Sequence, residues 1–341
     1  MGEACWDTEG GTAAPAERIE SHFAPRLRAL ELALIESRIA SASAMPPLDF
    51  KAMMAAERAK AHGASVGESG SAPTADTAAA GASSAKQGVE APELSWRLPR
   101  EAPRPRFDDV HRVVSAPSTV WHMPDFVTAA EEEAMLKCAG RSPAERWTQL
   151  RGRRLQNLGG LPRPPPEGMT KEPLPGWVAS ICDGLVAAGV FPPEAPPNHV
   201  LLNEYHPGQG IDAHRDGPLY EPRVAILSLG STCSFDFVSN DEAREPLCSL
   251  LLPRRGLLIF GDDAYHTHLH TVPALTSDAE RPGLVRLDQP AQQQQAGQQQ
   301  EATEAAAAAV PPSPMPRGRR ISLTVRRVLH VQSEEQAAQP A

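Results

Sequence analysis

Six short apolar segments in the second half of the chain constrain the fold more than any other feature. Each is rich in aliphatic or β-branched residues, and glycine, proline and charged residues separate them. They span residues 199–205, 223–230, 233–238, 247–253, 256–260 and 321–331. Such a run of short strands predicts an antiparallel sandwich or jelly roll.

A flank with helical character precedes these strands. A strand is expected within 118–128, followed by a helix over 129–140 with Thr128 as its N-cap and glutamates in its first turn. A second helix is expected over 176–190, and the Arg-, Gly- and Pro-rich residues 146–169 are expected to form a long excursion. The predicted fold class is therefore mainly β (α+β), a jelly-roll core with an N-terminal flank of helices and a strand.

The remaining segments lie outside this predicted core. Residues 1–63 read as an accessory helical segment, because amphipathic patterns recur over 16–41 and 47–63. Residues 64–106 are mostly small, polar and aperiodic, as is typical of a disordered linker. The other predicted boundaries are 107–195 for the flank and substrate lid, 196–333 for the core, about 278–316 for a disordered insertion within the core, and 334–341 for a disordered tail.

Charge and cysteine content indicate the protein's surroundings. The net charge of -9 argues against a general attraction to nucleic acid or to an anionic membrane. The five cysteines are widely spaced and form no CxxC pair, which favours reduced thiols. The N-terminus shows no signal-peptide pattern, and no apolar run approaches the roughly 20 residues of a membrane span. We therefore expect an intracellular protein of the nucleus or cytoplasm that does not bind a membrane.

A histidine and an aspartate lie one residue apart in "GIDAHRDGPLY", at His214 and Asp216. Such a pair belongs to a metal site, a catalytic dyad or an ordinary polar turn. A non-haem Fe(II) site would need a second histidine to complete two imidazoles and one carboxylate. The segment "YHTHLHTV" offers His266, His268 and His270, which alternate and would project to one face of a strand. Periodicity alone does not choose among them.

The segment "RRISLTVRRV" carries two arginines on the polar face of an expected strand. Its apolar face holds Ile321, Leu323 and Val325, and its polar face holds Arg320, Ser322, Thr324 and Arg326. Six residues of strand separate the two arginines by about 20 Å at a rise of about 3.3 Å per residue. They could hold opposite ends of a short dicarboxylate, because guanidinium binds carboxylate bidentately. The alternative is an edge strand with solvated arginines.

Taken in order, these motifs resemble those of the AlkB-like Fe(II)/2-oxoglutarate-dependent dioxygenases. The matching pieces are "NEY", "HRD", "HLHTV" and "RISLTVR", and the resemblance covers residues 107–277 and 317–332. The stretches "WTQLRGRRLQNLGGLP" and "NHVLLNEYHPGQGI" bring it closest to the eukaryotic branch known as AlkB homologue six. The resemblance implies a double-stranded β-helix, an oxidoreductase, and Fe(II), 2-oxoglutarate and dioxygen as cofactor and co-substrates.

The same resemblance implies roles for individual residues. It implies iron ligands at His214, Asp216 and His270, where the register of the family's distal histidine selects His270. It implies contacts to 2-oxoglutarate from Asn203, Tyr205, Arg320, Ser322 and Arg326. A substrate-recognition lid is implied over 141–163, and the candidate substrate contacts are Trp147, Arg153, Arg154, Gln156, Asn157 and Tyr220.

The substrate that this reading favours is an N-alkylated nucleic acid, which would be oxidatively demethylated. Arginines could hold phosphates and Trp147 could stack on a base, or the loop could be structural with Trp147 buried. Pro218 stands where repair members of the family often carry an acidic residue, which keeps a protein side-chain hydroxylase or demethylase as an alternative.

Two further functions are compatible with the sequence, a binding module and a hydrolase. The first is a nucleic-acid or protein binding module whose iron site does not turn over. A hydrolase built on His214 and Asp216 has less support, since no serine or cysteine nucleophile motif accompanies them. We expect a monomeric catalytic domain and a protein partner for the N-terminal helices.

Overall fold

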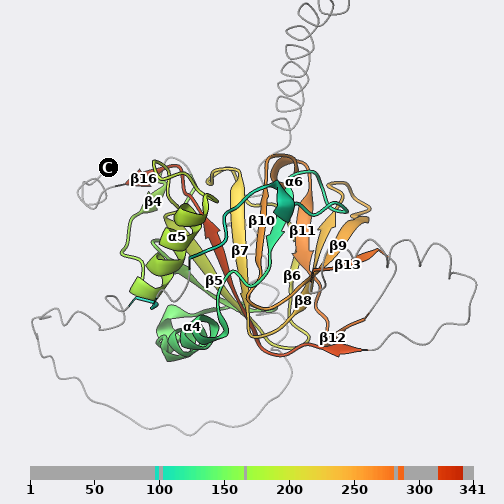
Figure 1. Ribbon diagram of the computed structural model, residues 1–341, viewed down its shortest axis with the longest axis horizontal. Coiled ribbons are helices and arrows are strands. Elements are labelled where there is room, and N and C mark those ends of the chain that lie inside the picture. The colour runs from blue at the N-terminus through green and yellow to red at the C-terminus, as the bar shows by residue number, and fades with distance from the viewer. Residues whose placement is uncertain (1–96, 100–102, 165–166, 280–282, 288–313, 333–341) are drawn as a thin grey trace, which may run out of the picture. The chain divides into compact units, whose positions relative to one another are not determined.

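The structure is a computed structural model that describes residues 97–99, 103–164, 167–279, 283–287 and 314–332 (Figure 1). The predictions for the accessory segment 1–63 and the tail 334–341 lie outside the described residues, as do most of the predicted linker and residues 288–313 of the insertion. Among the described residues, no helix combines the length and apolar character needed to cross a membrane.

Two β-sheets dominate the described part of the chain (Figure 1). The larger has the order β1 (Val120–Met123), β10 (Leu257–Gly261), β7 (Arg223–Leu229), β15 (Arg320–Arg326), β5 (His199–Tyr205), β3 (Arg154–Leu158) and β2 (Thr148–Gln149). The smaller has the order β13 (Leu284–Arg286), β9 (Pro246–Leu252), β8 (Cys233–Val238), β11 (Leu269–Val272) and β6 (Ile211–His214). Two short pairs complete the strands: β12 (Ser277–Asp278) with β14 (Met315–Pro316), and β16 (Val331–Gln332) with β4 (Met169–Thr170).

Side chains of both sheets form one shared core, which confirms the predicted jelly-roll class. The cluster includes Ile226 of β7 and Phe260 of β10 from the larger sheet, and Phe235 of β8 and Leu250 of β9 from the smaller. Within each of these sheets the neighbouring strands are antiparallel, except that β13 runs parallel to β9. Two antiparallel sheets that bury facing side chains are the architecture expected of a sandwich or jelly roll.

Two helices cover the other face of the larger sheet (Figure 1). They are α4 (Ala129–Arg141) and α5 (Gly176–Ala188), and the shorter helices are η1 (Asp109–His111), η2 (Ala144–Arg146) and α6 (Asp262–His266). Apolar side chains of α4 and α5 pack with Leu202 of β5 and with Leu323 of β15 in a second core. The larger sheet therefore has one face toward the helices and one toward the smaller sheet.

The first helix begins where the sequence predicts. Thr128 accepts a hydrogen bond from the backbone N–H of Glu131, and the Glu131 carboxylate accepts one from the backbone N–H of Thr128. This reciprocal pair is a capping box, which satisfies two backbone donors at the helix start. Glu131 is also buried against the Arg104 guanidinium, with 2.6 Å between the paired atoms. The capping prediction is confirmed.

Most strand predictions also agree with the structure, and the main correction lies in residues 146–169. This stretch was expected to be an excursion, but it contains β3, which pairs with β5 along its whole length. Its arginines and glycines obscured a five-residue strand whose alternate side chains are buried on opposite faces. The stretch predicted as a disordered insertion likewise contains β13, and β12 pairs with β14 so that residues on either side of the insertion lie together.

Candidate metal centre

His214, Asp216 and His270 converge at one end of the smaller sheet. One ligand atom from each lies within 4.8 Å of the others. His214 ends β6, Asp216 follows two residues later, and His270 lies on β11 as the direct pairing partner of His214. The imidazole centroids are 4.3 Å apart. Antiparallel pairing of β6 with β11 therefore places the distal histidine across from the first one.

The other two histidines of the "YHTHLHTV" segment lie elsewhere. We expected His266, His268 and His270 to share a strand face, and this is wrong, because α6 ends at His266 and β11 starts only at Leu269. His266 is exposed, and His268 is partly buried with its Nδ1 beside the Thr267 hydroxyl at 2.7 Å. The first residues of the segment, Tyr265 and His266, belong to α6 and not to the expected strand. Among these three histidines, the structure brings only His270 to the His214–Asp216 pair.

Both imidazoles are held in the neutral form with defined orientation. Burial lowers the pKa of His270 to about 3, and burial also lowers the pKa of His214 despite the neighbouring Asp216 carboxylate. The His214 Nδ1 lies 2.9 Å from the carbonyl oxygen of Asp212. A carbonyl can only accept, so Nδ1 carries the proton and Nε2 keeps a free lone pair. A neutral imidazole with its second nitrogen hydrogen-bonded is the state in which histidine binds metals.

Aromatic side chains fix the position of His270. Its ring stacks on Phe235 with centroids 5.5 Å apart and an angle of 13° between planes. The Phe260 ring lies beside the imidazole, tilted by 57°, with centroids 5.1 Å apart. The imidazole is therefore packed into the core between the sheets, which restricts its rotamers.

The Asp216 carboxylate is ionised and keeps one oxygen available. Although burial acts to raise its pKa, the Arg326 guanidinium lowers the pKa of Asp216 below its ordinary value. Arg326 donates a hydrogen bond to Oδ1, whereas Oδ2 is buried without a hydrogen-bond partner among the described residues. Two neutral imidazoles, one carboxylate and an unsatisfied carboxylate oxygen fit a divalent metal with mixed nitrogen and oxygen ligands.

A second polar cluster lines the interior face of the larger sheet beside the triad. It comprises Asn203, Tyr205, Arg320, Ser322 and Arg326, each at most 6% exposed. Pairing of β5 with β15 sets Asn203 opposite Ser322 and Tyr205 opposite Arg320. The intervening residues of β15 face the helices and are fully buried apolar side chains. Strand alternation therefore gathers the five predicted co-substrate residues on one face.

The two arginines occupy different surroundings within this cluster. Arg326 pairs with Asp216 and lies over the Tyr220 ring, 4.0 Å from its centroid. Arg320 donates a hydrogen bond to the Ser228 hydroxyl at 2.9 Å and lies 5.5 Å from the Tyr205 centroid. Nε of both arginines is buried without a hydrogen-bond partner among the described residues. These open donors fit an anionic ligand with a carboxylate at each end.

Three of the six predicted substrate residues lie on this interior side. Arg153 donates from Nε to the Asn203 side-chain oxygen at 3.1 Å. Asn157 lies 3.1 Å from Nε2 of His199, and the His199 ring faces Tyr220 with centroids 5.8 Å apart. These side chains extend the co-substrate cluster from β5 toward β3 and Tyr220.

The other three, Trp147, Arg154 and Gln156, lie on the helix-covered side and are not brought to the triad. Arg154 lies 4.3 Å over the Trp147 ring and pairs with the buried Glu204 carboxylate. Gln156 accepts a hydrogen bond from Ser142. Alternation along β3 places Arg154 and Gln156 on the opposite face of the sheet from Asn157. The predicted substrate contacts assumed a loop, and they therefore combine residues of both faces.

Sequence reasoning missed His199, which is fully buried beside Asn157 and Tyr220. Burial lowers its pKa well below the ordinary value, and the nearby Arg326 charge lowers it further. The signal was present in "HVLLNEY", because a period of two places His199 on the same face as Asn203 and Tyr205.

Comparison with known proteins identifies this arrangement. The sequence profile described as the 2OG-Fe(II) oxygenase superfamily matches residues 120–326. The chain belongs to the 2OG-Fe(II) oxygenase superfamily. Its members are oxidoreductases that use Fe(II), 2-oxoglutarate and dioxygen, and the His214–Asp216–His270 cluster is consistent with that use.

Relatives place the chain among the AlkB-like members of this superfamily. It is 38% identical over 226 residues to a Danio rerio protein named "Probable RNA/DNA demethylase ALKBH6", covering 63% of this chain and 88% of that protein. It is 34% identical over 104 residues to the Macaca fascicularis "tRNA (carboxymethyluridine(34)-5-O)-methyltransferase ALKBH8", covering 30% of this chain and 15% of that protein. The solved structure of OsALKBH1 aligns with a TM-score of 0.39 at 15% identity, covering 61% of this chain and 98% of that one.

Proposed function

We propose that His214, Asp216 and His270 bind the Fe(II) of this oxygenase. The observation that carries this assignment is the approach of their ligand atoms to within 4.8 Å of one another, from β6, the following turn and β11. Two histidines and one carboxylate on one face leave the opposite positions of the metal open for other ligands. The neutral imidazoles and the free Asp216 oxygen supply the donors.

We further propose that 2-oxoglutarate lies along the interior face of β15. Arg326, beside Asp216, would hold the end nearest the metal, and Arg320 would hold the far carboxylate together with Ser228. Asn203, Tyr205 and Ser322 lie between or beside these arginines on paired strands. Fe(II), 2-oxoglutarate and dioxygen together supply the oxidant, while 2-oxoglutarate becomes succinate and carbon dioxide.

The proposed substrate is an N-alkylated nucleic acid. Support comes from the Danio rerio relative, whose name describes an RNA/DNA demethylase and of which this chain covers 88%. Insertion of one oxygen atom into an N–CH₃ group gives an N–CH₂OH group, which loses formaldehyde and leaves N–H. The second oxygen atom of dioxygen enters succinate, so the step balances without a further reductant.

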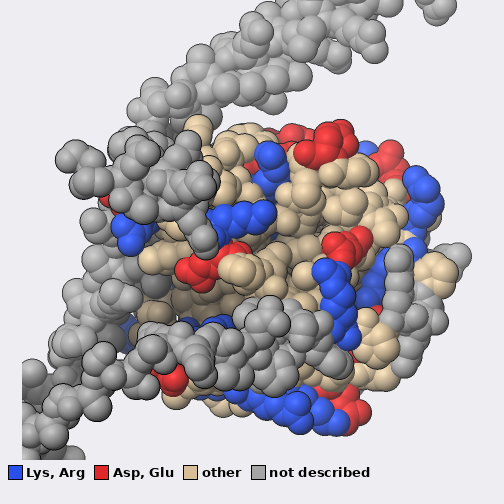
Figure 2. Space-filling model, turned by 90° about the vertical axis from the view of Figure 1, so that its left-hand side faces the viewer, with Lys and Arg blue, Asp and Glu red and all other residues tan. Residues whose placement is uncertain are grey.

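Substrate contacts are proposed for the interior set, Arg153, Asn157 and Tyr220. On the face shown in Figure 2, outside the grey atoms, basic side chains lie among acidic ones. Together with the net charge of -9, this favours recognition by contacts close to the metal centre over capture on one continuous basic face. Trp147 and Arg154, which stack on each other on the helix-covered side, would support the edge of the sheet.

A methylated or hydroxylatable protein side chain is the second candidate substrate. Pro218 follows Asp216 by two residues, where repair members of the family often carry an acidic residue near the base. The same chemistry at the metal would demethylate N-methyl-lysine. A binding module with an idle iron site has less support, because all three proposed metal ligands lie within 4.8 Å of one another and both arginines are present on β15.

Turnover assays distinguish these substrates. Full-length protein with Fe(II) and 2-oxoglutarate would be given N-methylated RNA, N-methylated DNA and methyl-lysine peptides, with succinate, formaldehyde and the demethylated product measured together. The proposal predicts stoichiometric formaldehyde and demethylated base from a nucleic acid, abolished in Asp216→Ala. Product from the peptides alone would move the assignment to a protein substrate, and slow substrate-independent succinate formation with every substrate would favour the idle-site reading.

A further inference from the structure

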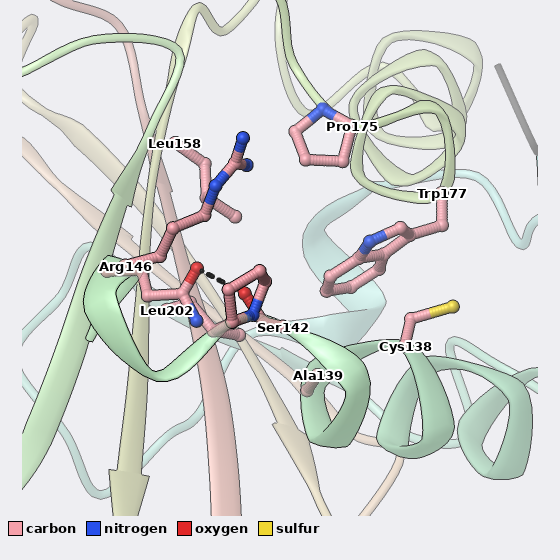
Figure 3. A pocket seen from close by; sticks show the side chains of 10 residues that line it. Cys138, Ala139, Ser142, Arg146, Leu158, Pro175, Trp177 and Leu202 are labelled. Carbon is pink, nitrogen blue, oxygen red and sulfur yellow. Dashed lines mark hydrogen bonds between the residues drawn. The ribbon is translucent and has the colours of Figure 1, made fainter. Parts of the chain in front are cut away.

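A cavity of about 80 Å³ lies on the helix-covered side of the larger sheet (Figure 3). It is bounded by the end of α4, by β3 and β5, and by the start of α5. Leu158, Trp177 and Leu202 contribute apolar wall, and Ser142, Arg146 and Gln156 contribute polar groups. None of the proposed ligands of iron or 2-oxoglutarate lines it.

Strand alternation separates this cavity from the metal centre. Gln156 of β3 pairs with Leu202 of β5, and both side chains line the cavity. The next residue of β5, Asn203, points to the opposite face and meets Arg153. The two sites therefore lie on opposite faces of one sheet and do not share side chains.

Gln156 presents an unused hydrogen-bond donor. Gln156 is only 3% exposed. Its Oε1 accepts a hydrogen bond from the Ser142 hydroxyl at 3.0 Å, drawn as a dashed line in Figure 3. Its Nε2 is buried with no hydrogen-bond partner among the described residues. A buried amide donor without an acceptor is costly, and native proteins almost always satisfy one with protein, water or ligand.

The charge around the cavity favours an anion. Arg146 lines it and is exposed at its outer side, so a guanidinium stands beside the cavity without being buried in it. Pro175 and Trp177 line it from the start of α5, where Pro175 is the N-cap, no side chain caps the backbone and no acidic residue occupies the first turn. The positive end of the 13-residue helix therefore lacks a compensating group of its own.

We propose that this cavity binds a short-chain carboxylate. The carboxylate would accept from Gln156 Nε2 and pair with Arg146, and the hydrocarbon would pack on Trp177 and Leu202. At about 80 Å³ the cavity has roughly half the volume of one that holds benzene, about 150 Å³. That volume accommodates the two-carbon chain of propionate with its carboxylate beside the exposed Arg146, whereas butyrate, with as many non-hydrogen atoms as benzene, is too large.

Titration of propionate into the metal-free full-length protein tests the proposal, with calorimetry as the readout. Saturable binding is expected, at least tenfold weaker in Gln156→Leu and in Arg146→Gln, and at least tenfold weaker for neutral propionamide in the wild-type protein. Arg146 is exposed, so its replacement tests the site even if Gln156→Leu fails to fold.

Two controls locate the binding. Arg163→Gln removes an exposed arginine that pairs with Glu167 away from the cavity, and it should leave propionate affinity unchanged. Arg320→Gln removes the proposed partner of the far carboxylate of 2-oxoglutarate, and this variant should also leave propionate affinity unchanged. Absence of saturable binding, or loss only in Arg320→Gln, would overturn the proposal. Because no metal or turnover is involved, either result is independent of the proposed demethylase activity.

Discussion

Two neighbouring arginines at the start of β15 allow a matched test of the 2-oxoglutarate site. Arg320 points to the interior, where it is 3% exposed and bonds Ser228. Arg319 precedes it and points the other way, to the Glu204 carboxylate that Arg154 also contacts. The two replacements Arg320→Gln and Arg319→Gln remove the same charge one residue apart, on opposite faces of the sheet.

The expected loss of affinity follows from the hydrogen bonds that a guanidinium makes. The buried Nε of Arg320 has no partner among the described residues, and its Nη2 uses one of two N–H groups on Ser228. Nε and the second N–H of Nη2 can therefore donate two charge-assisted hydrogen bonds to a carboxylate. At about 1.5 kcal/mol each, their loss costs about 3 kcal/mol. That corresponds to an increase of about 100-fold in the Kd for 2-oxoglutarate. Arg319→Gln leaves these bonds intact, and its Kd should stay within about twofold of the wild type.

The assay is anaerobic isothermal titration of 2-oxoglutarate into Fe(II)-loaded protein. Far-UV circular dichroism of both variants checks that each is folded. A Kd for Arg320→Gln within threefold of wild type would refute the assigned role of Arg320. An equal loss in both variants would refute the argument from strand alternation, because only one of the two side chains faces the site.

Three further predictions concern stability. Thr128→Ala removes half of a capping box and should lower the free energy of unfolding by about 1 kcal/mol in urea denaturation, and full stability would contradict the cap assignment. Burial and the nearby His111 charge lower the pKa of His122 from 6.5 to about 4. Because the unfolded chain takes up that proton first, this residue should cost about 1 to 2 kcal/mol of stability on going from pH 7 to pH 5. Urea titrations at both pH values should show a smaller drop for His122→Gln, and an unchanged drop would contradict the assignment. Gly210→Ala should destabilise by more than about 2 kcal/mol, since a Cβ there would lie 2.2 Å from the Val272 carbonyl oxygen, whereas Gly140→Ala meets nothing within 4 Å and should be neutral or slightly stabilising in thermal melts.

Much of the core could be predicted because apolar alternation and turn residues mark its strands. The segment "HVLLNEY" was expected as a strand and forms β5 from His199 to Tyr205. "RISLTVR" likewise forms β15, with its polar and apolar faces as expected. Both strands lie in the middle of a sheet, where local pattern and burial agree.

The rest depended on information that a linear pattern does not carry. Three alternating histidines looked equivalent, but a helical turn ending at His266 removes that equivalence. Only the pairing of β6 with β11 sets His270 opposite His214, and such a pairing joins segments more than fifty residues apart. For β3 the local pattern itself was misleading, because arginine and glycine are not typical of a strand. Without the strand, the sequence did not show that Arg154 and Gln156 lie on the opposite face from Asn157.

Several predictions from the sequence stay predictions. These are the nuclear or cytoplasmic location, the monomeric state of the catalytic domain and a protein partner for the N-terminal helices. The boundaries of the accessory segment, linker and tail belong with them.

The metal centre is tested most directly by an anaerobic titration of Fe(II) and 2-oxoglutarate into the metal-free protein, following the visible metal-to-ligand charge-transfer band. We expect a band in the wild type that is absent from Asp216→Ala and His270→Ala and retained in His268→Ala, because His268 lies outside the triad. A folded wild type without a band, or a band that survives in His270→Ala, would contradict the assignment of the metal centre.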